Sequence, residues 1–286
     1  MMVVRETTAP ELAAPGGRLE APPGQSLRVV RILWHREVLR LRRNWARGVV
    51  GLITPLMFLL IFGLGLESAG GEPGGRLQDY AAYLLPGMFV MAMQAPAVAV
   101  GLSVVWDRQM GFLRQALVAP VKRGSILIGL CLGGATTGTL YGLPVLAVGG
   151  FVGVPYDARL LLVLAEGALV ALTFTALGVL AAVCIARIET FQIVMSTGMM
   201  PLLFFSGAFF PVNGLPGWLG TVCALNPLTY AIDAIRRTMP GELSPGVSTS
   251  LDLGGWTPPV LLELALVGWL ALTVVVIARH RFSRPG

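Results

Sequence analysis

Long apolar stretches separated by short polar connections make up most of the chain after residue 47. A transmembrane helix needs about 20 mainly apolar residues, because its backbone polar groups must all bond within the segment. Six stretches have this length, so the pattern predicts an all-α membrane protein with six transmembrane helices. The predicted spans are residues 48–66, 81–105, 125–152, 160–184, 191–210 and 259–279.

A different pattern precedes the first span. Between residues 26 and 47, apolar residues recur every three or four positions, and arginines recur on the opposite face. Such a helix, with tryptophans on its apolar face, is typical of the membrane interface. A helix that packs on a partner protein would show the same pattern, but direct continuity with the first span favours the membrane. The residues assigned to the amphipathic interfacial helix 26–47 are Trp34, Arg36, Arg40, Arg43, Trp45 and Arg47.

The basic residues predict how the chain is oriented. With the N-terminus inside, seventeen of the 21 Arg and Lys residues lie in the N-terminal segment, in connections 106–124 and 185–190, and at the C-terminal end. This asymmetry follows the positive-inside rule and predicts a multi-pass protein of the inner (cytoplasmic) membrane with both termini cytoplasmic. Residues 1–25, rich in Pro and Gly, are expected to be a flexible cytoplasmic tail. The four basic residues placed outside are Arg76, Arg159, Arg236 and Arg237.

Composition agrees with a membrane protein. Hydrophobic residues make up 55% of the chain and charged residues 13%, whereas soluble domains carry about 25% charged residues. A disordered chain is excluded, because so much apolar surface requires burial. The net charge of +6 is compatible with nucleic-acid binding, but the basic residues follow the topology, so no nucleic-acid partner is expected.

Few residues are suited to chemistry. The single lysine, Lys122, is followed by Arg123, so the chain has no phosphate-binding loop, which needs Ser or Thr after Lys. The three cysteines are scattered and match no metal spacing. His35 and His280 lie in basic segments, and no nucleophile–base pair is apparent. We therefore expect no enzymatic activity, no metal and no cofactor bound by this chain.

Two connections stand out. Residues 106–123 are too polar to span the membrane and too long for a turn, and Met110, Leu113 and Leu117 predict a short amphipathic helix that ends at Pro120. Residues 211–256 predict two short helices broken at Asn226-Pro227. Neither helix is long enough to cross a bilayer. The pair is either re-entrant, dipping into the outer leaflet against protein, or an amphipathic loop on the outer surface.

These segments resemble the permease subunits of type-2 ABC exporters. Connection 106–123 is similar to their cytoplasmic loop at Asp107, Arg108, Gly111, Leu113, Pro120, Val121 and Arg123. Gln109 stands where that family usually has glutamate. The family's second signature is matched at Phe205-Ser206-Gly207, Phe210-Pro211, Asn226-Pro227-Leu228-Thr229-Tyr230 and Arg236. The resemblance covers about residues 26–280 and is nearest the drug-resistance and nodulation-factor exporter branch.

The resemblance implies a transmembrane domain over residues 48–280, with a re-entrant helical pair between spans five and six. It also implies that connection 106–123 docks on an ATPase. The residues implied for this coupling are Asp107, Arg108, Gly111, Phe112, Leu113, Arg114, Leu117, Pro120 and Arg123. The residues implied for the outer re-entrant segment are Phe205, Gly207, Phe210, Pro211, Asn226, Pro227, Tyr230, Asp233 and Arg236.

Two carboxylates, Glu166 and Glu263, fall inside predicted spans, where charge is costly and suggests a functional path or a partner. In one interpretation they face a pathway for cationic amphipathic cargo. In the other they lie near the outer headgroups, with Glu166 satisfied by Arg159 or water. The candidate substrate path comprises Glu166, Met199, Met200, Phe204, Phe209 and Glu263.

The function expected from these features is that of a permease subunit in an ATP-driven exporter of an amphipathic drug- or lipid-like substrate. Its expected partners are a dimer of ABC ATPase subunits that bind ATP and Mg, a second permease copy (identical or related) and membrane lipid. Alternatives are an exporter of polysaccharide or glycolipid, or a secondary transporter without an ATPase. Against the latter, no repeat between halves and no pair of ion ligands in unwound helices is evident.

Overall fold

The computed structural model describes residues 25–68, 76–110, 123–213, 215–241, 251 and 255–283, and no strand occurs in these ranges. The prediction of an all-helical protein is confirmed. The helices are α1 (Gln25–Arg43), α2 (Trp45–Ser68), α3 (Arg76–Gln109), α5 (Arg123–Gly149), α6 (Arg159–Cys184), α7 (Ile188–Phe204), α8 (Gly217–Leu225), α9 (Pro227–Thr238) and α10 (Val260–Ser283), with a 3₁₀ turn at Gly150–Val152.

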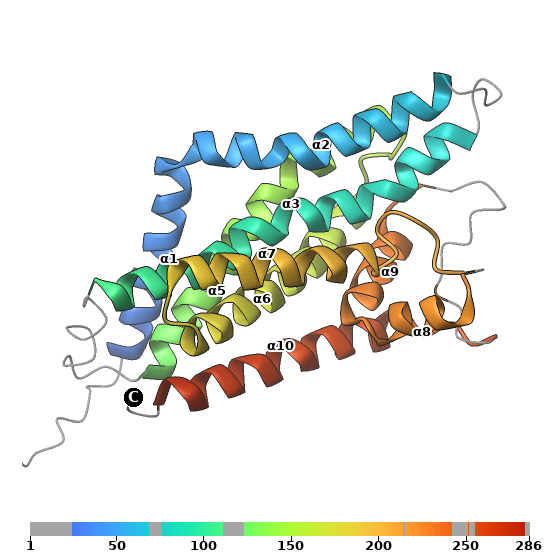
Figure 1. Cartoon of the computed structure of the whole chain (residues 1–286). Helices are drawn as coiled ribbons and strands as arrows, with labels where there is room; N and C mark the ends of the chain where they lie inside the picture. The colour runs from blue at the N-terminus through green and yellow to red at the C-terminus, as the bar shows by residue number, and fades with distance from the viewer. Residues whose placement is uncertain are drawn as a thin grey trace, which may run out of the picture.

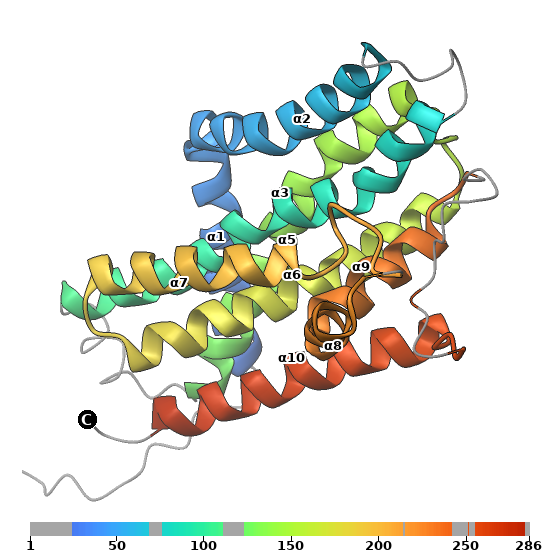
Figure 2. The same ribbon diagram turned by 45° about the vertical axis from the view of Figure 1, so that its right-hand side comes forward.

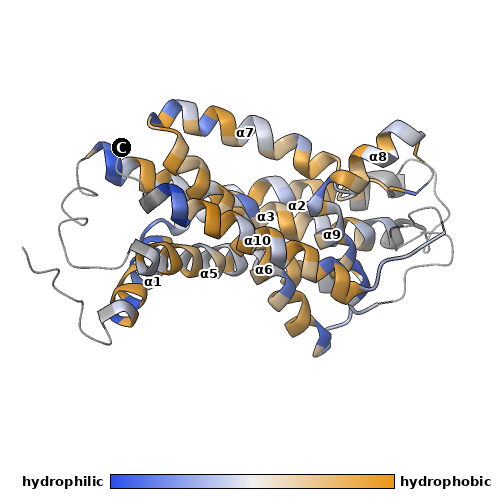
Figure 3. Ribbon diagram, turned by 90° about the horizontal axis from the view of Figure 1, so that it is seen from below, coloured by the Kyte–Doolittle hydropathy of each residue, from blue (hydrophilic) through white to orange (hydrophobic). Residues whose placement is uncertain are grey.

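Within the described ranges, four helices are long and apolar enough to cross a membrane: α3, α5, α6 and α10. The bent pair α1 and α2 adds a fifth candidate, with 73° between its two parts. Helix α7 is apolar but has 17 residues, fewer than the about 20 that a span needs. The long helices are mainly hydrophobic along their length, and hydrophilic segments gather near helix ends and at α9 (Figure 3).

The helices run between two ends of a bundle (Figure 1). One end holds α1, the end of α3, the beginning of α5, the turn between α6 and α7, and the end of α10. The other end holds α8, α9 and the beginning of α10, as the rotated view also shows (Figure 2). The described segments that the sequence predicts to be cytoplasmic therefore lie together at the same end of the bundle.

Helix α3 lies at the centre and packs against α2, α5 and α6. Its side chains Leu84, Met88, Phe89 and Met93 are fully buried. Further along α3, a methyl group on Gly101 would overlap the backbone carbonyl of Gly178 on α6. Small residues at such crossings let two helix backbones approach closely, as in many membrane bundles.

Helix α3 extends beyond predicted span 81–105 at both ends. Two other predicted elements end earlier than the sequence indicates. The N-terminal helix ends at Arg43, so Trp45 already belongs to α2. Helix α7 ends at Phe204, six residues before the predicted end of span five. Both differences occur because the apolar pattern continues through a change of direction. Helix α1 also packs along α5, where Gly129 and Gly133 admit its backbone and side chains.

The crossing of α3 and α6 yields a stability prediction. Gly101→Ala should force the two backbones apart and cost about 1–3 kcal/mol of stability, because the overlapping atoms are backbone. Thermal unfolding in a single detergent would measure the loss. Gly268→Ala is the matched control, since a methyl there meets its nearest atom at 3.9 Å. Equal melting temperatures for the two variants would contradict the prediction.

Candidate functional site

The Asn226-Pro227 motif joins the two short helices to α7. The Asn226 side chain accepts a hydrogen bond from the Leu228 N–H (3.0 Å) and donates one to the Leu202 carbonyl (2.6 Å). It therefore caps the beginning of α9, where Pro227 also favours the first helical turn. The Tyr230 hydroxyl donates to the Ala224 carbonyl (2.8 Å) and holds α9 against α8.

Arg236 on α9 is buried within the bundle. Its guanidinium lies 3.8 Å from the centre of the Tyr83 ring, a cation–π contact with α3. It also donates to the Gly207 carbonyl (2.8 Å), which accepts a second bond from the Tyr83 hydroxyl (3.0 Å). Gly207 has a φ of +72°, a conformation that favours glycine. The signature residues Gly207 and Arg236, 29 positions apart, are thus in direct contact.

The rest of this signature surrounds that contact. The Phe205 carbonyl accepts a hydrogen bond from the Thr229 hydroxyl (3.3 Å). Phe210 is half-buried and Pro211 is exposed, directly after the turn at Gly207. Hydrogen bonds therefore join Phe205, Gly207 and Asn226 to α9.

Arg237, the next residue on α9, lies between two carboxylates. Its side chain contacts Asp233 on the same helix (3.1 Å) and Glu263 on α10 (2.5 Å). Glu263 is completely buried, and Asp233 also accepts from the Leu251 N–H (3.1 Å). The sequence analysis placed Arg236 and Arg237 on the outer side of the membrane. In the structure both side chains turn into the protein and bond there.

Glu166 on α6 also faces α9. It accepts a hydrogen bond from the Thr238 hydroxyl (2.8 Å). Arg159, considered above as its partner, instead lies 3.8 Å from Asp157 in an exposed pair. Both intramembrane carboxylates thus have partners within the chain.

The other four residues of the candidate substrate path lie apart from these carboxylates. Met200 and Phe204 on α7 are exposed, Met199 is half-buried, and the Phe204 and Phe209 rings stack with centroids 4.8 Å apart. The ring of Phe58 on α2 packs on the ring of Phe209, with the ring centroids 5.6 Å apart. The structure therefore divides the predicted path into an apolar group on α7 and a charged group around α9.

The base of connection 106–123 is bonded to two other elements. Asp107 forms an ion pair with Arg36 of α1 (3.1 Å). Arg108 donates to the Val183 carbonyl and Gln109 to the Ala186 carbonyl, both at 3.1 Å, near the turn between α6 and α7. The amide of Gln109 can donate this bond, which an ionised glutamate cannot.

Other coupling residues and the predicted short helix lie outside the described residues, namely Gly111, Phe112, Leu113, Arg114, Leu117 and Pro120, while Arg123 begins α5.

In α1, Glu37 contacts both Arg36 (3.0 Å) and Arg40 (3.5 Å). The Trp34 indole donates to the Thr136 hydroxyl of α5 (3.0 Å). Arg43 and Trp45 are exposed on either side of the bend. The arginine-rich face therefore includes one buried carboxylate, which is 3% exposed.

Sequence reasoning missed Glu37, Tyr83, Arg237 and Thr238 as members of these contacts. A signal existed for Arg237, because Asp233 precedes it by four positions on a helix, the spacing at which opposite charges meet. No local signal pairs Tyr83 with Arg236 or Thr238 with Glu166. These pairs depend on how α3 and α6 pack against α9.

The contacts of Arg237 with Asp233 and Glu263 predict that two substitutions will have non-additive effects on stability. Arg237→Gln leaves two buried carboxylates without their cation, and breaking a buried pair in this way costs about 3–5 kcal/mol. Adding Glu263→Gln removes one of those charges, so the double variant should be more stable than Arg237→Gln alone. Melting temperatures of the single and double variants in one detergent measure this coupling.

Arg159→Gln serves as the control, because its pair with Asp157 is exposed and such pairs contribute about 0–1 kcal/mol. A double variant less stable than Arg237→Gln would show that Arg237 does not neutralise Glu263.

The comparisons with known proteins agree with this geometry. Residues 28–239 match the ABC-2 type transporter family. The chain is 28% identical to nodulation protein J of Rhizobium leguminosarum bv. viciae, with 88% of this chain and 94% of the relative covered. It is 32% identical to the daunorubicin resistance ABC transporter permease protein DrrB1 of Streptomyces coeruleorubidus, with 66% and 67% covered. It is 29% identical to the putative transport permease ycf38 of Cyanophora paradoxa, with 72% of each chain covered. The chain therefore belongs to the ABC-2 type transporter family of multi-pass membrane permeases.

Proposed function

We propose that this chain is the permease subunit of an ATP-driven exporter that moves an amphipathic drug- or lipid-like molecule across the cytoplasmic membrane. Permeases of this family normally work with an ATPase partner. In this proposal that partner binds ATP and Mg. The chain crosses the membrane six times, through α2, α3, α5, α6, α7 and α10, and both termini are cytoplasmic. Helices α8 and α9 form a re-entrant pair at the outer end.

The bonding at the base of connection 106–123 carries this proposal. Asp107 ties that base to α1, and Arg108 and Gln109 tie it to the turn between α6 and α7. An ATPase that pushes on the connection would therefore move α1 and the beginning of α7 together. The 73° bend lets α1 lie along the membrane surface while α2 crosses the membrane, as an interfacial lever requires.

The exposed faces of α2 and α7 support a second permease copy. Large apolar side chains on α7, namely Ile193, Val194, Met200 and Phe204, are 41–64% exposed. Helix α7 packs within the chain mainly against α3 and α6. A second copy placed over α7 would cover this short helix and enclose Met200 and Phe204 between the subunits. This apolar lining and a relative named for daunorubicin resistance favour an amphipathic cargo.

Affinity purification tests the proposal. The tagged chain, purified from membranes of its own host, should bring down an ABC ATPase in equal amount. That ATPase should hydrolyse ATP faster with the permease than alone, because the membrane subunit stabilises its closed dimer. Mass spectrometry and phosphate release measure the two results. Purification without any ATPase would overturn the proposal and favour a secondary transporter.

A second prediction addresses coupling. Asp107→Ala removes the ion pair with Arg36, a partly exposed pair worth about 0–1 kcal/mol. We expect the complex to assemble and melt normally, whereas cargo export per ATP hydrolysed should fall several-fold. Asp157→Ala, at the exposed pair just before and at the start of α6, is the control and should export normally. Unchanged export per ATP in Asp107→Ala would contradict the coupling role.

A further inference from the structure

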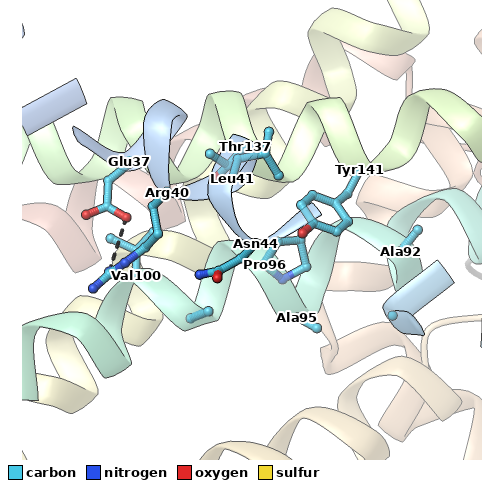
Figure 4. Close-up of a pocket in the computed structure, with 12 residues that line it drawn as sticks. Glu37, Arg40, Leu41, Asn44, Ala92, Ala95, Pro96, Val100, Thr137 and Tyr141 are labelled. Carbon is cyan, nitrogen blue, oxygen red and sulfur yellow. Dashed lines mark ion pairs between the residues drawn. The ribbon is translucent and has the colours of Figure 1, made fainter. Parts of the chain in front are cut away.

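A cavity of about 230 Å³ lies inside the bend between α1 and α2. Figure 4 shows its lining, which comes from α1, α2, α3 and α5. The volume is below the about 300 Å³ at which sites for drug-sized ligands begin. It therefore suits one segment of a larger amphipathic molecule.

The floor of this cavity is a strip of small residues on α3. Ala92, Ala95 and Ala99 recur every three or four positions, with Pro96 next to Ala95, so this side of α3 carries small side chains. Gly51 of α2 forms one wall, and a methyl group there would meet no atom within 4 Å. The cavity thus has room for an apolar chain beside Gly51.

The opposite end of the cavity is polar. Arg40 of α1 and Asn44, the residue between α1 and α2, lie there, with the Tyr141 hydroxyl of α5 near Asn44 and Pro96 (Figure 4). Glu37 is also present and contacts both Arg36 and Arg40, while Arg36 also contacts Asp107. Arg40 is 47% exposed and its ion pair is long, 3.5 Å, so its guanidinium has donors free for a second anion.

The net positive charge of α1 favours an anionic ligand over a cationic one. Helix α1 carries six arginines and one glutamate, and basic residues near a membrane surface attract anionic lipid by about 1 kcal/mol each. A cationic headgroup would meet this excess positive charge, whereas an anionic phosphate would be attracted by it.

We propose that this cavity binds an anionic phospholipid from the leaflet that contains α1. One acyl chain lies along Ala95 and Ala99 beside Gly51, and the phosphate accepts hydrogen bonds from Arg40 and Asn44. The lipid then fills the space between α1 and α2 and supports the bend between them. This site does not depend on ATP, on cargo or on a second copy of the chain.

Native mass spectrometry of the full chain in detergent tests the proposal, with palmitoyl-oleoyl phosphatidylglycerol and the matching phosphatidylcholine as probes. We expect one phosphatidylglycerol per chain to be retained at concentrations where phosphatidylcholine is lost. Gly51→Leu fills the space for the chain, and Arg40→Gln removes the phosphate donor. Each should weaken phosphatidylglycerol retention about tenfold, equivalent to about 1.4 kcal/mol.

The chain offers matched controls. Gly220→Leu places the same side chain on α8, where a methyl also meets open space, and Arg43→Gln removes the same charge from α1 outside the cavity lining. Gly220→Leu should retain the lipid as the unmodified chain does, and Arg43→Gln should weaken its retention clearly less than Arg40→Gln. Ala95→Leu is a second filling variant in case Gly51→Leu does not fold. Equal retention of the two lipids, or undiminished retention by the folded filling variants and Arg40→Gln, would overturn the proposal.

Discussion

The arrangement of the end of the bundle that holds α8 and α9 depends on the burial of one positive charge, that of Arg236. A guanidinium inside an apolar bundle has no water to solvate it, so the protein must supply its partners. The Tyr83 ring and the Gly207 carbonyl do so. These partners come from α3 and from the turn after α7, and neither can move away from α9 without leaving the charge unsatisfied. One side chain therefore holds three parts of the chain together.

The next residue on α9 extends this constraint to a fourth element. Consecutive residues on an α-helix point about 100° apart, so Arg236 faces α3 while Arg237 faces α10. Arg237 contacts Asp233 and the fully buried Glu263 there. Helix α9 thus connects the centre of the bundle with its last helix. This is why a helix of twelve residues, too short to span a membrane, is integral to the fold.

At the opposite end of the bundle, a partly exposed ion pair joins α1 to α3. Arg36 and Asp107 are partly exposed and meet across α1 and α3. Between the two ends, Gly101 and Gly178 bring α3 and α6 into backbone contact.

Much of the fold was predictable, because the length of an apolar run can be read directly from consecutive residues of the sequence. The predicted spans 125–152 and 160–184 agree with α5, its following turn and α6 to within two residues at each boundary. The bend at Asn44 and the early end of α7 were not predictable from that property. Trp45 keeps the helical spacing of the apolar stripe past Asn44, and apolar residues continue after Phe204. The site was predictable in part. The resemblance selected Gly207, Asn226 and Arg236, but the buried partners of Arg236 and Arg237 were not predicted.

By itself, the sequence determined an all-helical membrane protein of the ABC exporter type, with its basic residues gathered in a few connections. Those conclusions follow from the burial of apolar runs and from short motifs, both of which are written in consecutive residues. Only the tertiary structure decided which charges meet. Arg236 pairs with a ring 153 positions away in the chain, and Glu166 bonds to Thr238 72 positions away. Such pairs form only when the helices pack, because packing brings residues that are far apart in the sequence to the same height on the facing sides of neighbouring helices.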